Sequence, residues 1–157
     1  MGKVVYLFEK DKEKVVKRKP YQISAYDIVK AIKRKFNIKW WEFWRSWRIY
    51  VADMYYYPVI PEILEYIRPT KYYEYKEEVF DCDDFSFLKK GYEEDYGYSE
   101  QKNFAFGIIW VFSPTKHYGH ALNFFIDDKL EMYFYEPQTD TYFKDIKDNW
   151  ELMLAVV

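Results

Sequence analysis

The stretch that decides the fold runs from Tyr118 to Tyr135 and reads YGHALNFFI, then DDK, then LEMYFY. Two apolar runs separated by the polar turn Asp127-Asp128-Lys129 predict a hairpin of two strands, 118–126 and 130–135. The run before them, 103–112, is apolar enough to be a buried strand. A last apolar stretch, 150–157, is expected to close the same sheet. This part of the chain therefore predicts an antiparallel meander.

Upstream of the meander, the sequence predicts helices. Asp81 is an acceptable N-cap for a helix over 81–90 that buries Phe85 and Leu88. Earlier in the chain, Ser24 with an acidic residue three positions later is typical of a capping box. The apolar residues behind Ser24 recur at helical spacing and predict an amphipathic helix that ends near Phe36. Its outer face is basic, which we interpret as ordinary solvated surface rather than a site for an acidic partner.

The segment that follows is rich in tryptophan. Trp40, Trp44 and Trp47 fall on one face of a helix, and we favour a helix packed into the core over one that contacts membrane or bases. A strand is expected over 48–54 and two more over 4–8 and 14–19. With helices first and then one helix before a meander, the predicted fold class is α+β. We expect a single domain over 1–157, with an aromatic-rich helical part (1–75) and a motif-bearing part (76–157).

Composition excludes several classes of protein. Half of the 157 residues are hydrophobic, which excludes a disordered chain. No apolar run approaches the ~18 residues of a membrane span, and charge appears by Glu9, too soon for a secretory signal. One cysteine cannot form an internal disulfide, so we expect an intracellular protein, in the host cytoplasm if it is viral. The net charge of −2 does not select nucleic acid, and the abundance of Lys and Glu is typical of a thermophile.

Three residues of the second half could form a reactive site. Cys82 starts a helix, His120 lies within a strand, and Glu136 lies at the end of the next strand. A thiol nucleophile needs a base within hydrogen-bonding reach and a third group that orients the base. Neighbouring hairpin strands place His120 and Glu136 close together. Each residue taken singly has a structural explanation, so the hypothesis depends on their convergence.

Acidic neighbours of Cys82 suggest a metal. The carboxylates of Asp83 and Asp84 disfavour a thiolate at Cys82. The helix dipole stabilises the thiolate by less than these carboxylates destabilise it. A bound divalent cation would reverse that balance. Together with the amide oxygen of Gln138, these carboxylates are oxygen ligands of the kind that Ca²⁺ takes. The pattern indicates a thiol whose reactivity depends on Ca²⁺ or another divalent cation.

The strings DCDDF (81–85), GHALN (119–123) and EPQT (136–139) resemble a known family. They are similar to the papain-like, calcium-dependent cysteine protease domain of the Marasmius oreades agglutinin type, shared by phage and viral proteins. The resemblance implies a papain-like α+β fold and hydrolysis or acyl transfer at an amide of a peptide or protein substrate. It implies Cys82 as nucleophile, His120 as base and Glu136 as orienting residue. It carries over no sugar-binding domain, because no part of the chain is long enough to be one.

Three other hypotheses remain open. A metal-dependent nuclease could hold Mg²⁺ with Asp81, Asp83, Asp84 and Glu136, which would make nucleic acid the partner. A non-catalytic viral binding protein could retain the fold and its metal. A zinc site with His117 and His120 would need a local turn, because two residues three apart in a strand point to opposite faces.

Overall fold

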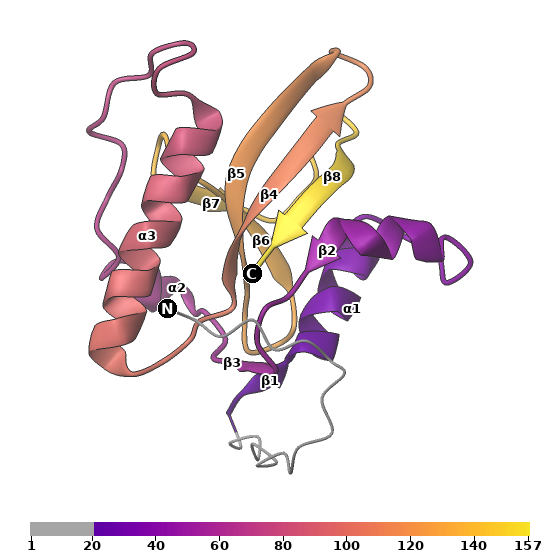
Figure 1. The fold of residues 1–157 in the computed structure, drawn as a ribbon, viewed down its shortest axis with the longest axis horizontal. Helices are drawn as coiled ribbons and strands as arrows, with labels where there is room; N and C mark the ends of the chain where they lie inside the picture. The colour runs from indigo at the N-terminus through magenta and orange to yellow at the C-terminus, as the bar shows by residue number, and fades with distance from the viewer. Residues whose placement is uncertain (1–20) are drawn as a thin grey trace, which may run out of the picture.

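A six-stranded sheet runs through the centre of the computed structural model, which describes residues 21–157 (Figure 1). Its strands, in their order across the sheet, are β2 (Ile49–Tyr50), β8 (Glu151–Val156), β4 (Phe106–Ser113), β5 (Tyr118–Ile126), β6 (Met132–Glu136) and β7 (Thr141–Phe143). All neighbours pair antiparallel except β2, which pairs parallel with β8. A separate two-stranded sheet joins β1 (Ile23–Ser24) to β3 (Tyr55–Tyr56).

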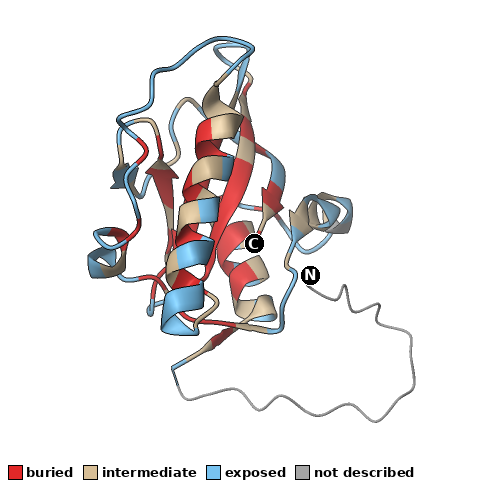
Figure 2. Ribbon diagram, turned by 60° about the vertical axis from the view of Figure 1, so that its left-hand side comes forward, coloured by how far each residue is buried: buried red, intermediate tan, exposed pale blue. Residues whose placement is uncertain are grey.

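The helices cover the two faces of the central sheet. They are α1 (Ala25–Lys35), the 3-10 helix η1 (Phe43–Arg48), the short α2 (Pro61–Leu64) and α3 (Cys82–Glu100). Figure 1 shows α3 and α1 on opposite sides of the strands, and Figure 2 shows that both helices contain buried residues. No helix among residues 21–157 combines the length and the apolar character needed to cross a bilayer.

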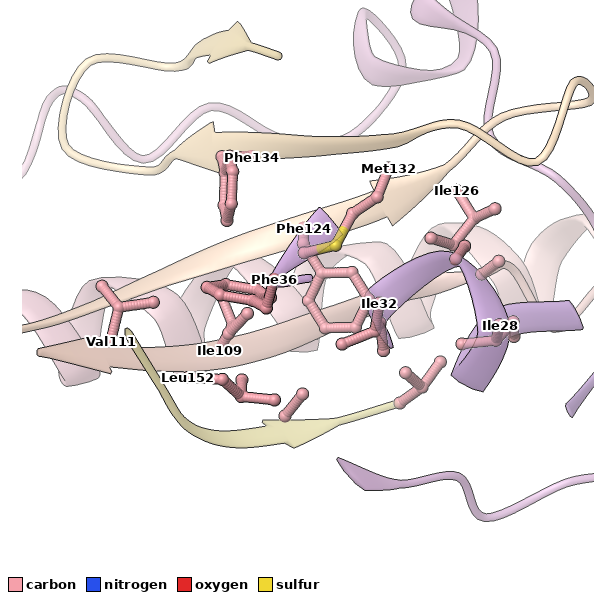
Figure 3. Close-up of a cluster of buried hydrophobic side chains, with 14 of the residues drawn as sticks. Ile28, Ile32, Phe36, Ile109, Val111, Phe124, Ile126, Met132, Phe134 and Leu152 are labelled. Carbon is pink, nitrogen blue, oxygen red and sulfur yellow. The ribbon is translucent and has the colours of Figure 1, made fainter. Parts of the chain in front are cut away.

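The larger hydrophobic cluster lies between the sheet and α1 (Figure 3). The helix side contributes Ile28, Ile32 and the C-cap residue Phe36. They pack against Phe124 and Phe134 of the strands. All five side chains are buried. Burial of apolar surface therefore drives the folding of this half of the molecule. A second cluster on the other face includes Phe106 and Phe125 and packs against the tyrosines of α3. The sheet is thus enclosed on both faces.

The structure confirms the predicted helix behind Ser24 and the hairpin. Ser24 forms a capping box with Asp27, whose main-chain N–H donates to Ser24 Oγ over 3.2 Å. The two hairpin strands pair as expected, and the last strand joins the sheet, although it lies inside it rather than at the edge. The strands expected over 4–8 and 14–19 lie outside the described residues.

Other predictions for the first half were wrong. The tryptophan-rich segment is a 3-10 helix with exposed indoles and not a core helix. The strand expected over 48–54 is reduced to the two residues of β2. The predicted N-terminal helices therefore amount to α1 alone, followed by short elements, and the sheet is mixed rather than purely antiparallel. The helix that begins with Cys82 extends to Glu100, ten residues farther than predicted.

Candidate functional site

Acidic caps fix the start of α3 and thereby the position of Cys82. The carboxylate of Asp81 accepts from the Asp83 main-chain N–H over 3.3 Å, and Asp84 Oδ2 accepts from the Asp81 N–H over 3.1 Å. This reciprocal pair satisfies main-chain donors that have no partner within the helix. Cys82 is consequently the first helical residue, as the sequence predicted.

The Cys82 side chain contacts strand β5 of the sheet. Its Sγ accepts from the Ala121 main-chain N–H over 3.4 Å, and the thiol also hydrogen-bonds the side chain of His120. On the helix side, Ser86 Oγ donates to the Cys82 carbonyl oxygen over 2.8 Å. The thiol is neither sealed in the core nor fully exposed. It is therefore held in place and open to solvent on one side.

His120 is fixed by a carboxylate on the next strand. The β5–β6 register pairs Asn123 with Tyr135, so Glu136 lies diagonally across the ladder from His120. Glu136 Oε2 lies 2.7 Å from His120 Nε2, and the two side chains are 18% and 19% exposed. With Nε2 engaged by the carboxylate, Nδ1 is the ring nitrogen left for Cys82.

Electrostatics favours a charged imidazole at this position. Burial lowers the pKa of His120, but hydrogen bonds and negative charge from Cys82 and Glu136 outweigh burial and raise it to about 9. The Trp150 ring lies 6.0 Å from the imidazole, centre to centre, and covers it on one side. A thiol beside an imidazole that a carboxylate orients is the arrangement of an activated nucleophile. The structure thus brings together the three residues predicted from the sequence.

Some of the acidic residues at the start of α3 lie close enough together to hold a metal ion. Ligand atoms of Asp81, Cys82 and Asp83 lie within 4.8 Å of one another. The shared hydrogen bond and the negative charge of Asp81, together with burial, raise the pKa of Asp83, a like-charge contact that a cation would relieve. Asp84 is engaged as the helix cap. Gln138 contacts Glu136 through its main chain: its N–H donates to Glu136 Oε1 over 3.3 Å.

The structure does not support the other sets of metal ligands. Both oxygens of Glu136 are engaged, by His120 and by the Gln138 N–H, so Glu136 does not join the aspartates in a nuclease-type site. His117 lies exposed in the turn between β4 and β5. Among residues 21–157, no group of possible metal ligands contains both histidines.

A buried network that the sequence analysis missed holds the turn after Glu136. Asp140 Oδ1 accepts from Lys89 Nζ over 2.9 Å and from Tyr135 OH over 2.7 Å, while its Oδ2 accepts from the Thr70 and Lys71 main-chain N–H groups. Burial opposes ionisation of Asp140, but the hydrogen bonds from these donors outweigh burial and lower the pKa of Asp140. The network ties α3, the 70–71 loop and the turn after Glu136 together.

Sequence carried only a weak signal of this network. Lys89 lies four residues after Phe85 on the buried face of α3, yet lysine at such a position is most often exposed. Burial lowers the pKa of Lys89 despite the opposite effect of Asp140. The two residues are 51 positions apart, so only the fold could pair them.

Comparisons with known proteins identify relatives of the chain. The family model described as "Agglutinin C-terminal" matches residues 63–142, just over half the chain. No curated protein matches the sequence. Two solved structures are similar: a complex of PSL1a with E64 (19% identity, TM-score 0.70) and the Polyporus squamosus lectin bound to the human-type influenza-binding epitope Neu5Acα2-6Galβ1-4GlcNAc (18% identity, TM-score 0.71). Each match covers 87% of this chain, and 51% and 50% of the matched chains respectively.

These relatives correct the expected identity and fold. They are named as an agglutinin domain and a lectin, and not as a papain-like peptidase. The fold is accordingly that of the matched half of the lectin, in place of the papain-like α+β fold with N-terminal helices and an antiparallel sheet. The chain spans about half the length of the solved structures it matches.

The expected function is corrected on the same grounds. An agglutinin family and a lectin point to a binding protein rather than to a cysteine hydrolase acting on peptides, and neither peptide nor nucleic acid is the partner they indicate. Side chains in a given arrangement do not fix an activity, since one fold serves many functions. The nuclease hypothesis is wrong on the same comparisons, and Glu136 pairs with His120 instead of joining the aspartates. The part of the chain that carries Cys82, His120 and Glu136 lies within residues 63–142, and the chain belongs to the agglutinin C-terminal family.

Proposed function

We propose that this chain is a binding domain whose ligand site is the cluster of Cys82, His120 and Glu136. The observation that carries the proposal is the convergence of three polar side chains from α3, β5 and β6 on one partly exposed point. The imidazole has a carboxylate on one side and a thiol on the other, which is the order of groups that activates a thiol. The arrangement leaves the thiol accessible to a ligand.

Within this site we assign the three roles that the sequence predicted. Cys82 is the group that bonds to an electrophilic ligand, His120 supplies or removes the proton, and Glu136 holds the imidazole in position. The Ala121 N–H at 3.4 Å from Sγ stabilises negative charge on the sulfur. The buried network around Asp140 supports Glu136 from behind, through the turn that carries Gln138.

The relatives supply two ligands for the test. PSL1a has been solved with E64, and the Polyporus squamosus lectin with a sialylated glycan. We expect this chain to bind E64 with a mass increase that is lost in Cys82→Ser and weakened in His120→Ala, with His117→Ala as the matched control. Glycan binding that survives His120→Ala, which removes a whole side chain from the cluster, would locate the sugar elsewhere and contradict the site. Repeated cleavage of a labelled peptide would contradict a binding-only domain.

We also propose a divalent cation, with Ca²⁺ first, beside this site. Asp83, Asp84 and Gln138 are the predicted ligands, and the proximity of the Asp81 and Asp83 carboxylates supports Asp81 as a fourth candidate. The crowding of carboxylates at the start of α3 supports the proposal, because a cation would relieve their repulsion. We expect Ca²⁺ to raise the melting temperature and Asp83→Asn to abolish the increase. If Ca²⁺ raises the melting temperature of Asp83→Asn by the same amount, Asp83 is not a ligand of the metal.

A further inference from the structure

Residues 39–48, here called the tryptophan segment, expose four indoles to solvent. Trp40 and Trp47 are 85% and 84% exposed, and Trp41 and Trp44 are 54% and 53% exposed. Exposed apolar side chains are common singly, but four large exposed rings within eight residues are a concentration of the kind that marks an interaction surface. Such a concentration of exposed apolar surface calls for a partner that covers it.

The patch stands on a part of the chain that projects from the body of the molecule. The segment follows α1, and its ribbon extends to the side of the sheet (Figures 1 and 2). Polar contacts of its own order it: the Lys39 main-chain N–H donates to Glu42 Oε2 over 2.8 Å, and Arg45 pairs with Glu42 Oε1 over 3.0 Å. The Trp40 and Trp41 rings meet edge to face at 5.6 Å. The indoles are therefore presented outward by an ordered support.

The charge around the patch is strongly positive. Residues 30–48 contain seven Lys and Arg residues and one acidic residue, Glu42, in a chain whose net charge is −2. Glu42 is neutralised by Arg45. Lys30, Lys39 and Arg48 are exposed on α1 and the segment. Arg34 pairs with Glu131 and Arg45 with Glu42. Lys39 and Arg48 lie within the tryptophan segment itself and are exposed, so one partner can contact these two cations and the indoles.

We propose that the tryptophan segment docks onto an anionic lipid surface. Indole rings partition to the boundary between headgroups and acyl chains, where the ring is buried and its N–H stays hydrated. Lysine and arginine beside them are attracted to acidic headgroups. A projecting segment can insert into that boundary, whereas a nucleic-acid strand or an extended peptide is held in a groove that follows its backbone. The partner that fits both the shape and the charge is therefore a membrane surface.

The test uses the full chain and vesicles of phosphatidylcholine with or without about 30% phosphatidylserine. We expect sedimentation with the anionic vesicles, a blue shift of tryptophan fluorescence, and weaker binding as salt rises from about 0.05 to 0.5 M. The double variant Trp40→Ala/Trp47→Ala should lower the partition coefficient by roughly tenfold or more. Both rings are exposed, so its circular dichroism should match that of the parent chain.

Matched controls separate the segment from exposed aromatic surface in general. Tyr72 and Tyr98 are 79% and 87% exposed outside the segment, and Tyr72→Ala/Tyr98→Ala should leave vesicle binding unchanged. The proposal is overturned if the parent chain does not bind anionic vesicles, or if both double variants lose binding equally. It is also overturned if a single-stranded oligonucleotide or the sialylated trisaccharide shifts the tryptophan fluorescence while vesicles do not.

Discussion

At the start of α3, the polar side chains of Cys82, His120 and Glu136 are each held by a partner from another element, whereas the tryptophan segment holds large apolar rings against solvent. In the first region, polar groups are brought inward and satisfied there. In the second, apolar groups are brought outward and left uncovered. The difference is the reason for proposing different kinds of partner for the two regions, a small ligand at the first and an extended surface at the second.

The largest expected effect comes from unpairing the buried network behind the site. Asp140→Ala leaves Lys89, which is 1% exposed, without its counter-charge and should cost about 3–5 kcal/mol of unfolding free energy. Urea denaturation measures the loss. Adding Lys89→Met should recover part of it, because the uncompensated charge is gone. If Asp140→Ala is neutral, the network does not support the site and the contrast between the two regions weakens.

The reactivity of the thiol tests the first region directly. His120→Ala should slow alkylation of Cys82 by iodoacetamide by roughly 100-fold at neutral pH, since the imidazole is the group that holds or removes the thiol proton. Glu136→Gln should have a smaller effect in the same direction. His117→Ala, at an exposed turn, should leave the rate unchanged. Equal rates in all variants would show that convergence in space does not activate the thiol.

Glu93 predicts a pH dependence of stability with an unusual sign. Burial raises its pKa from 4.5 to about 7, although Lys90 Nζ lies 2.6 Å from its carboxylate and acts in the opposite direction. We give burial the greater weight, because Glu93 is 1% exposed. A raised folded-state pKa means that the folded state binds a proton more tightly than the unfolded state.

Stability contributed by Glu93 is therefore highest below about pH 4.5 and is lost as the pH rises to about 7. Glu93→Gln should raise the free energy of unfolding at pH 8 by about 1–3 kcal/mol and remove this dependence. Glu94→Gln is the control, since that carboxylate is 60% exposed. Melting curves between pH 4 and 8 decide the matter, and a parallel shift of both variants would be evidence against the assignment.

The smallest effect is expected in the tryptophan segment. Trp47→Ala should change stability by less than about 0.5 kcal/mol, because its ring is 84% exposed. Trp150→Ala, the same substitution at a ring that is 6% exposed, should cost about 3–5 kcal/mol. Chemical denaturation of the two variants side by side sharpens the comparison. A loss of 2 kcal/mol or so at Trp47 would mean that the segment belongs to the core.

Much of the site could be predicted because its signals are local. An acidic capping box at Asp81 fixes the start of a helix, and a turn at Asp127 places the strands of His120 and Glu136 side by side. Local sequence carried no comparable information about Asp140 and Lys89, whose pairing depends on how the 70–71 loop and the turn after Glu136 pack on α3. The activity was not predictable either, since the same three side chains are compatible with binding and with catalysis.

The prediction of a core helix for the tryptophan segment was wrong for a physical reason. Trp40, Trp44 and Trp47 have the spacing of a buried helix face, but α1 already covers that side of the sheet with Ile28 and Ile32. The segment is instead a short 3-10 helix with its indole rings exposed. Helix α3 likewise continues to Glu100, beyond the end predicted at residue 90, and buries Lys89, Glu93 and Gly97 along one face.

Strand β8 has a consequence for how the protein is made. It is synthesised after β4, β5 and β6, yet it lies inside the sheet between β4 and β2, and it pairs Ala155 and Val156 with Ile49 and Tyr50. A nascent chain on the ribosome therefore carries β4 with an open edge until β8 emerges. The sheet can be completed only by joining segments about a hundred residues apart, which slows folding and exposes the growing chain to aggregation.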